Sequence, residues 1–173
     1  MKLAMSKTRE QFPLSEKKPL KKTMPSIVSS VVFFVIVLIG GLISASFLNW
    51  SFSLIFLIVI LIGVLLLLSC FFMYQFQIWY FQVYFYDLTE DFIIIRKRVL
   101  TPREITIPYE RIQDVYVDQD LLDRIFGLYD VHLSSATVSS GMEAHIDGLE
   151  KEAAGSLRTK ILEKLNEKIK KQK

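Results

Sequence analysis

Two histidines and the aspartates near them are the side chains best suited to chemistry in this sequence. His132 and His145 fall on the polar faces of neighbouring predicted strands, so pairing of these strands would bring them together. Asp130 and Asp147 share the same faces. A metal site usually needs three or four ligands at fixed spacing, which this pattern lacks. We therefore expect no metal or cofactor. The alternative is a small membrane enzyme or a metal-dependent accessory subunit that uses these residues.

No other group of residues predicts a catalytic centre. The only cysteine, Cys70, lies in a long apolar stretch and excludes an intrachain disulfide. An acidic run lacks the glycine and terminal glutamate of a calcium loop, so we expect a solvated surface in which Asp120 caps a short helix; the run is Asp114, Asp118, Asp120 and Asp123. The sequence therefore predicts a protein that is not an enzyme.

A cluster of positive charges is the best candidate for an anion contact. Arg96, Lys97 and Arg98, with Arg103 across the next turn, could face phosphate oxygens. Two roles are open: contact with anionic lipid headgroups, or exposed charges that keep strand edges from aggregating. Residues 87–173 carry 16 acidic and 14 basic side chains, a net charge of −2. A nucleic-acid partner is therefore not expected.

The elements that must position these residues begin with a membrane anchor. Residues 23–86 contain no Asp, Glu, Lys, Arg or His. Because about 20 apolar residues cross a bilayer as a helix, this stretch predicts a transmembrane hairpin with spans Ser26 to Leu48 and Ser51 to Met73 and an interfacial exit up to residue 80. Asn49 and Trp50 form the turn. A cleaved signal peptide is disfavoured because the first apolar run is about twice the usual length.

Charge before the hairpin predicts its orientation. Residues 1–22 carry seven basic and two acidic side chains, and the positive-inside rule places this end in the cytoplasm. Two spans return the chain to that side, so we expect a plasma-membrane protein with both termini cytoplasmic. Residues 1–25 contain three prolines and little periodicity, which predicts a disordered basic tail. Small residues permit close helix packing, either inside the hairpin or in self-association; they include Gly40, Gly41, Ser44, Ala45 and Gly63.

Residues 81–173 predict a small domain of strands followed by one helix. Alternating patterns at 81–86, 92–100, 104–108, 112–117, 128–133 and 142–147 predict six short strands in a sandwich or barrel. The inward positions of the last four include Ile105, Ile107, Tyr129, Val131, Leu133, Met142, Ala144 and Ile146. Residues 118–126 predict a short helix, ended by Gly127, that plugs one end of the sheet. An amphipathic helix follows from Glu150, with Leu157, Ile161, Leu165 and Ile169 on its apolar face.

The order of these elements resembles a known family. Two spans, then Pro108 with Arg111-Ile112-Gln113, then Arg124-Ile125-Phe126-Gly127-Leu128 are similar to the bacterial pleckstrin-homology-like (PH-like) membrane proteins, the YdbS-like family. The resemblance covers about residues 33–164. It implies an α+β domain with a strongly bent antiparallel sheet or split β-barrel, capped at one open end by the C-terminal helix. It implies no activity, because the role of this family is generally unassigned.

The resemblance does not extend to phosphoinositide binding. PH domains that bind phosphoinositides carry basic residues around the first strand turn, whereas this turn is Thr89-Glu90-Asp91. We therefore expect a non-enzymatic, membrane-anchored interaction module. Its expected partners are the lipid bilayer together with another membrane protein, a second copy of the chain, or anionic lipid.

Overall fold

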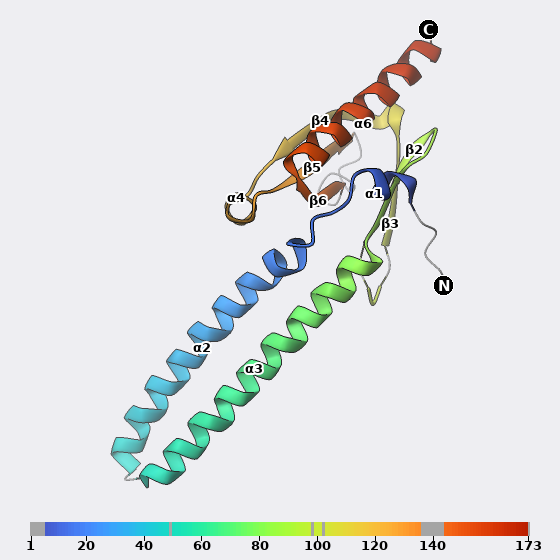
Figure 1. The fold of residues 1–173 in the computed structure, drawn as a ribbon. Coiled ribbons are helices and arrows are strands. Elements are labelled where there is room, and N and C mark those ends of the chain that lie inside the picture. Colours follow the sequence, from blue (N-terminus) through green and yellow to red (C-terminus); the bar gives the residue numbers. More distant parts are fainter. Residues whose placement is uncertain (1–5, 49, 98, 102, 136–143, 173) are drawn as a thin grey trace. The chain divides into compact units, whose positions relative to one another are not determined.

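The chain forms two compact units (Figure 1). The structure, a computed structural model, describes residues 6–48, 50–97, 99–101, 103–135 and 144–172. One unit comprises residues 19–78, and the other combines the chain up to Lys18 with the chain from Trp79 onward. Three residues named in the sequence-based predictions, Asn49, Arg98 and Met142, lie outside the described part.

The first unit consists of two long helices, most of α2 (Lys18–Leu48) and of α3 (Phe52–Val83). Both are long and apolar enough to cross a membrane, and neither apolar stretch is buried within the protein. The helices extend beyond the predicted spans: α2 begins before Ser26, and α3 continues past Met73 into the second unit. The predicted strand pattern from residue 81 therefore begins too early, because the last turn of α3 takes up Phe81 to Val83.

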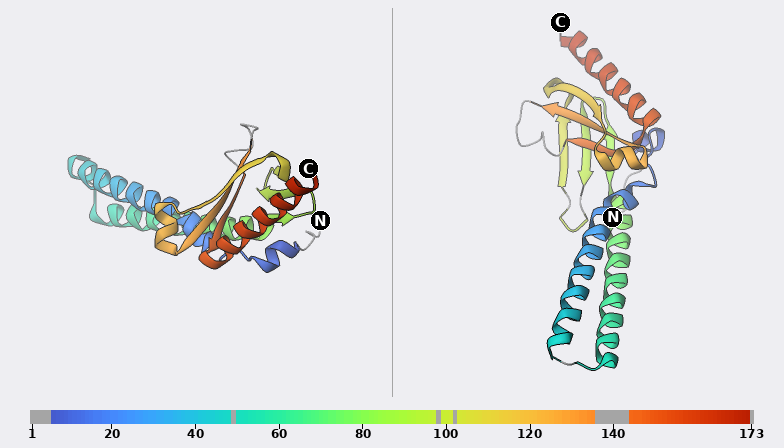
Figure 2. Two further views of the ribbon diagram at one scale, coloured as in Figure 1. Left: turned by 90° about the horizontal axis from the view of Figure 1, so that it is seen from above. Right: turned by 90° about the vertical axis from the view of Figure 1, so that its left-hand side faces the viewer.

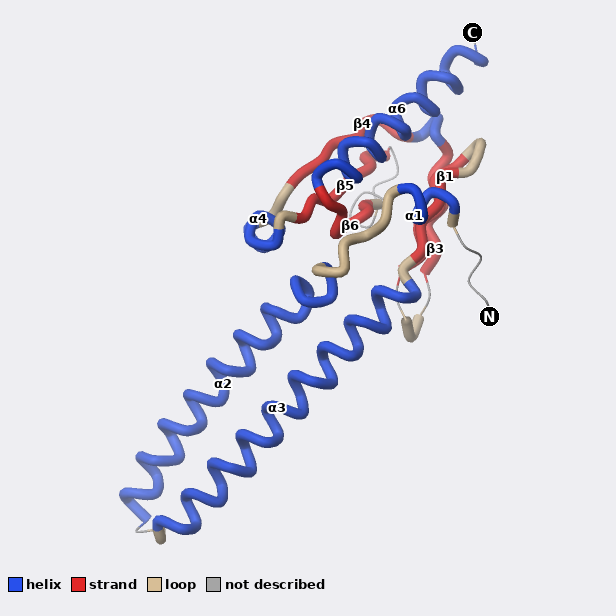
Figure 3. The backbone as a smooth tube through the Cα atoms, viewed as in Figure 1, coloured by secondary structure: helices blue, strands red, loops and turns tan. Residues whose placement is uncertain are grey.

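The second unit contains two three-stranded antiparallel sheets, in which the six predicted strands are found (Figures 2 and 3). The first sheet has the order β1 (Phe85–Leu88), β2 (Phe92–Lys97), β3 (Arg103–Pro108), and the second has the order β4 (Ile112–Asp118), β5 (Leu128–Ser135), β6 (His145–Glu150). The short helix η1 (Tyr109–Arg111) connects the two sheets, and α4 (Leu121–Phe126) connects β4 to β5. The short helix α1 (Lys7–Gln11) precedes the long helices, and α6 (Lys151–Gln172) follows β6. The PH-like architecture is confirmed.

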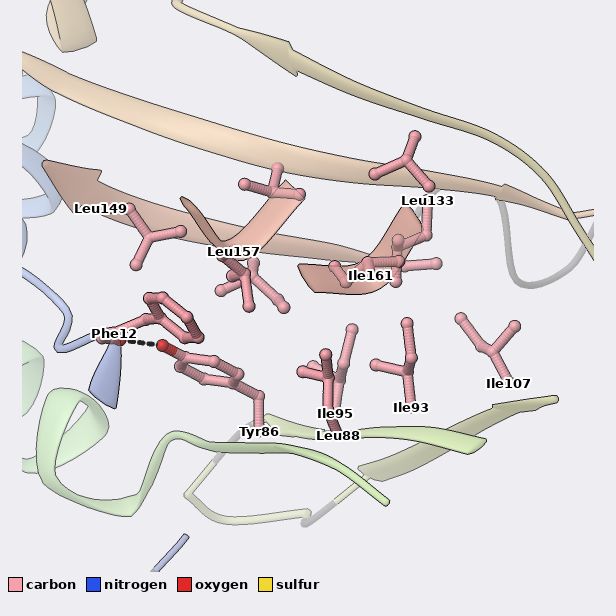
Figure 4. Packing of buried hydrophobic residues seen from close by; sticks show 14 of the residues in the cluster. Phe12, Tyr86, Leu88, Ile93, Ile95, Ile107, Leu133, Leu149, Leu157 and Ile161 are labelled. Carbon is pink, nitrogen blue, oxygen red and sulfur yellow. Dashed lines mark hydrogen bonds between the residues drawn. The ribbon is translucent and has the colours of Figure 1, made fainter. Parts of the chain in front are cut away.

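The core lies where the two sheets face each other, and α6 contributes to it. Figure 4 shows side chains of both sheets directed toward one another, with Leu157 and Ile161 of α6 between them. Most of the predicted inward positions are fully buried, namely Ile107, Val131, Leu133, Ala144 and Ile146. Ile105, Tyr129 and Leu165 are partly buried against the core, and Ile169 is exposed. Alternation along the strands therefore predicted the core well.

Residues 6–18, which we call the N-terminal strap, differ from the prediction of a disordered tail. Phe12 and Leu14 are buried in the core, and Leu14 forms a β-bridge with Leu149. The Tyr86 hydroxyl donates a hydrogen bond to the Phe12 carbonyl (Figure 4). The strap has no periodicity because it adds single residues to a core built by distant strands. Composition alone therefore suggested disorder where tertiary contacts impose order.

Polar contacts attach the start of the strap to β1 and to the end of α3. The Ser6 and Thr8 hydroxyls donate to Asp87 Oδ1 at 2.9 and 2.6 Å. Burial raises the pKa of Asp87, but these hydrogen bonds outweigh burial and hold the pKa below its ordinary value. Arg9 donates to the carbonyl oxygens of Phe81 at 3.0 Å and Tyr84 at 2.5 Å. The guanidinium thus satisfies carbonyls where α3 ends.

A buried ion pair fixes the other end of the strap. Lys18 Nζ lies 3.1 Å from Asp147 Oδ1, with the two side chains 2% and 5% exposed. The ammonium also lies 3.5 Å from the centre of the Tyr84 ring. Next to the pair, Gly148 has a φ of +82°, and a Cβ there would lie 2.7 Å from Lys18 Cδ. Only glycine allows both this backbone conformation and this contact.

The predicted role of α4 as a plug is wrong. Leu121 and Ile125 are 77% and 68% exposed. Asp123, which is fully buried, occupies the inward position of this helix instead. The predicted caps are confirmed: Asp120 accepts a hydrogen bond from the Asp123 amide, and Gly127 ends the helix with a φ of 69°. Apolar spacing identified a helix here but not which face it turns inward.

We predict opposite effects of adding a methyl group at two glycines. Gly148→Ala should lower the free energy of unfolding by about 2 kcal/mol or more, because it strains a positive φ and displaces Lys18. Gly155→Ala, in α6 with open space around its Cβ position, should leave stability unchanged or raise it by up to about 1 kcal/mol. Thermal unfolding of the full chain in detergent compares the two. Equal midpoints for both variants would contradict the prediction.

The strap should loosen in acid because of Asp87. The folded-state pKa of this carboxyl is depressed, so its contribution to stability is complete above the unfolded pKa of about 3.9 and is lost as pH falls through the folded value. Hydrogen exchange at the amides of Arg9 and Glu10 in α1, and of Phe12 at its C-terminal cap, should therefore accelerate below about pH 4, relative to β5 amides. Asp87→Asn should remove this pH dependence. An unchanged pH profile in Asp87→Asn would argue against the assignment.

Candidate membrane-surface site

The end of the first sheet that lies next to α3 carries the predicted basic cluster. β1 begins two residues after α3 ends at Val83, and Phe85, the first residue of β1, pairs with Arg96. Lys97 pairs with Arg103 across the next strand. The β2–β3 turn therefore lies where the chain arrives from α3. We call Arg96, Lys97 and Arg103 the basic end.

Three of the four predicted basic residues lie at this end of the sheet, but Arg96 and Lys97 are adjacent on β2 and so project to opposite faces. Arg96 Nε donates to Glu104 Oε2 at 2.9 Å, and its guanidinium lies 5.5 Å from the centre of the Phe85 ring. Lys97 Nζ lies 3.3 Å from His145 Nε2. Arg103 is exposed and opposite Lys97, and the predicted fourth member, Arg98, is outside the described residues. Because exposed ion pairs contribute about 1 kcal/mol at most, the pair of Arg96 with Glu104 adds little to stability.

The opposite end of the same sheet is acidic and is occupied by α6. Lys168 contacts Asp91, and this hydrogen bond, together with the charge of Asp91, raises the pKa of Lys168. Lys164 Nζ donates to the Thr89 carbonyl at 2.6 Å. These lysines of the C-terminal helix are therefore drawn to the acidic turn at Thr89–Asp91. The first sheet thus has ends of opposite charge.

The two histidines do meet, as strand pairing predicted. His145 pairs with His132, which pairs with Tyr116, across the second sheet. The His132 ring is stacked on both neighbours, with centroid distances of 5.0 Å to Tyr116 and 5.1 Å to His145. His132 Nε2 lies 3.0 Å from Asp118 Oδ1. The row of rings joins β4, β5 and β6 and ends beside Lys97 of the basic end.

The aspartates proposed to join the histidines have other partners. Asp130 Oδ1 accepts the Gly148 amide at 2.8 Å, and Asp147 holds Lys18. Within the described part of the chain, no three or more His, Cys, Asp or Glu side chains are grouped so that they could hold a metal ion. Asp130 and Asp147 therefore serve to position β6 and the strap.

An open groove of about 830 Å³ lies between β4 and α6. Its lining includes Tyr116, Asp118 and Tyr129 from the second sheet and Gly155, Arg158 and Thr159 from α6. Arg158 Nε donates to the Val115 carbonyl of β4 at 3.0 Å. This contact satisfies a backbone acceptor on an edge strand and so protects the edge from pairing with another chain.

Sequence reasoning missed the residues of the strap that hold the domain at both of its connections to the helices. Arg9 and Lys18 look like members of a basic tail, yet Arg9 caps α3 and Lys18 pairs with Asp147. The alternation of Phe12 and Leu14 around Pro13 is the one local signal of a short extended segment. A positive φ at Gly148 has no local signal at all.

Comparison with known protein families gives a match over most of the chain. The family model described as "Bacterial PH domain" matches residues 23–165, which include both long helices and the domain through most of α6. The strap lies before the matched region. No curated protein and no solved structure gives a significant match.

Proposed function

Because the chain belongs to the bacterial PH domain family and carries two helices long and apolar enough to cross a membrane, we propose that it is a membrane-anchored interaction module. PH-like families are generally non-catalytic, which supports a binding role. In this proposal α2 and α3 span the plasma membrane, and both termini and the domain are cytoplasmic. The charge balance of residues 1–22 supports that orientation through the positive-inside rule.

The position of the basic end supports anionic lipid headgroups as a ligand. Arg96 is opposite the first residue of β1, directly after the helix that leaves the membrane, whereas the acidic turn lies at the far end of β1. Guanidinium and ammonium groups bind phosphate oxygens, and a basic residue near an anionic surface contributes about 1 kcal/mol. The charge polarity of the first sheet therefore favours a domain whose basic end faces the lipid.

Replacing the basic end should reduce selectivity for anionic lipid. In the full chain reconstituted in bilayers, Arg96→Gln, Lys97→Gln and Arg103→Gln together should lower the association of spin-labelled phosphatidylglycerol relative to phosphatidylcholine, by up to about 1 kcal/mol per charge. Glu104→Gln should raise it, because Arg96 loses its ion-pair partner. Added salt should weaken both effects by screening.

A matched control removes the same charge elsewhere. Lys151→Gln, Lys160→Gln and Lys170→Gln lie along α6 and should leave the selectivity unchanged. If this control lowers selectivity as much as the basic-end variant, net charge alone is responsible and the headgroup site is contradicted.

A second copy of the chain, or another membrane helix, is the other partner that an observation favours. A Cβ at Gly40 of α2 would meet nothing within 4 Å, whereas Gly41 lines a cavity between α2 and α3. Packing of α2 on α3 therefore does not require glycine at position 40. Small residues that leave space on a membrane helix allow a further helix to approach closely. Of the two alternatives left open by the sequence, the surroundings of Gly40 favour self-association, and those of Gly41 favour packing within the hairpin.

Filling this space should weaken association between copies. Gly40→Leu should lower energy transfer between labelled copies in vesicles several-fold at equal protein-to-lipid ratio, since the added side chain prevents close approach. Ile36→Leu with Ile39→Leu is the control, because it changes side-chain shape on the same helix without adding volume. Unchanged energy transfer in the glycine variant would exclude this face as the interface.

A further inference from the structure

The short helix α4 presents an apolar pair outward. Leu121 and Ile125 are one helical turn apart and 77% and 68% exposed. Arg124 lies between them in sequence and is also exposed. Two aliphatic side chains and one cation on an outward face match the composition of segments that lie in a membrane interface.

The helix is held rigidly in this orientation. Six residues cannot form a stable helix alone, because the first turn costs more than it gains. Here Asp120 and Asp123 cap each other's backbone amides, and Gly127 ends the helix in the left-handed conformation. Asp123 is fully buried on the inner side. Leu121 and Ile125 are therefore directed outward by fixed contacts.

Connectivity places α4 close to the point where α2 begins. Leu128 follows α4 directly as the first residue of β5, and two residues later Asp130 accepts the Gly148 amide. Gly148 in turn contacts Lys18, the first residue of α2. Two strand residues span about 7 Å. The eight helical residues from Lys18 to Ser26, where the predicted apolar span starts, cover about 12 Å.

We propose that α4 lies in the interfacial layer of the bilayer that α2 and α3 span, with Leu121 and Ile125 toward the acyl chains and Arg124 among the headgroups. This inference rests on the proposed membrane anchoring but not on the basic end. Its driving force is burial of apolar surface. Anionic lipid is not required, because Asp118 and Asp120 beside α4 would be repelled by it.

The test uses the full chain in nanodiscs made only of zwitterionic phosphatidylcholine. In a Cys70→Ala background, an environment-sensitive fluorophore is attached at Leu121→Cys or at Ile125→Cys. Its emission should shift to the blue, and lipid carrying a nitroxide near the headgroup should quench it. The matched control is Lys160→Cys, an exposed position on α6, where emission should stay water-like and unquenched.

Two results would overturn the proposal. Emission at positions 121 and 125 equal to that at position 160 would show that α4 lies in water. A blue shift without quenching by the nitroxide lipid would show that a protein surface, from a second copy or another chain, covers α4 instead. Because no anionic lipid is present, failure of the headgroup site leaves the expected result unchanged, and the two proposals fail separately.

Discussion

The buried ion pair between Lys18 and Asp147 is the contact on which the arrangement of the domain depends. It joins the end of the N-terminal strap to β6 at the residue where α2 begins. Removing two charges from water is expensive, and a pair this deeply buried is maintained only when further contacts compensate. The Tyr84 ring below the ammonium and the bare backbone of Gly148 beside it provide that environment. Burial, with the charge of Asp147, raises the pKa of Tyr84 and keeps its phenol protonated.

The strap and α3 together connect the domain to the helices at two points. At one, Lys18 leads into α2; at the other, Arg9 satisfies carbonyls at the end of α3, and Tyr80 and Phe81 of its last turn pack against the core. Within the first sheet, the basic end lies where the chain enters β1, and the acidic turn at the other end binds lysines of α6.

Local sequence patterns predicted most of the helices and strands. The charge-free stretch of residues 23–86 predicted two helices because only a bilayer or a very large core accommodates such a run. Period-two alternation predicted the strands and the buried Ile107, Leu133 and Ile146, since one face of each strand is covered. The caps of α4 were predicted from Asp120 and Gly127 because capping hydrogen bonds join residues only a few positions apart.

The sequence by itself therefore determined the helical hairpin and the order of six strands and a terminal helix, and it placed His132 and His145 where pairing of their strands would bring them together. Only the tertiary structure decided that residues 6–18 pack on the domain and that Leu121 and Ile125 point outward. It also decided that Asp147 forms an ion pair with Lys18. The physical reason is sequence separation. Lys18 and Asp147 are 129 positions apart, and neither has neighbours whose spacing encodes the other. A buried charge is stable only beside its partner, and the fold alone brings that partner within reach.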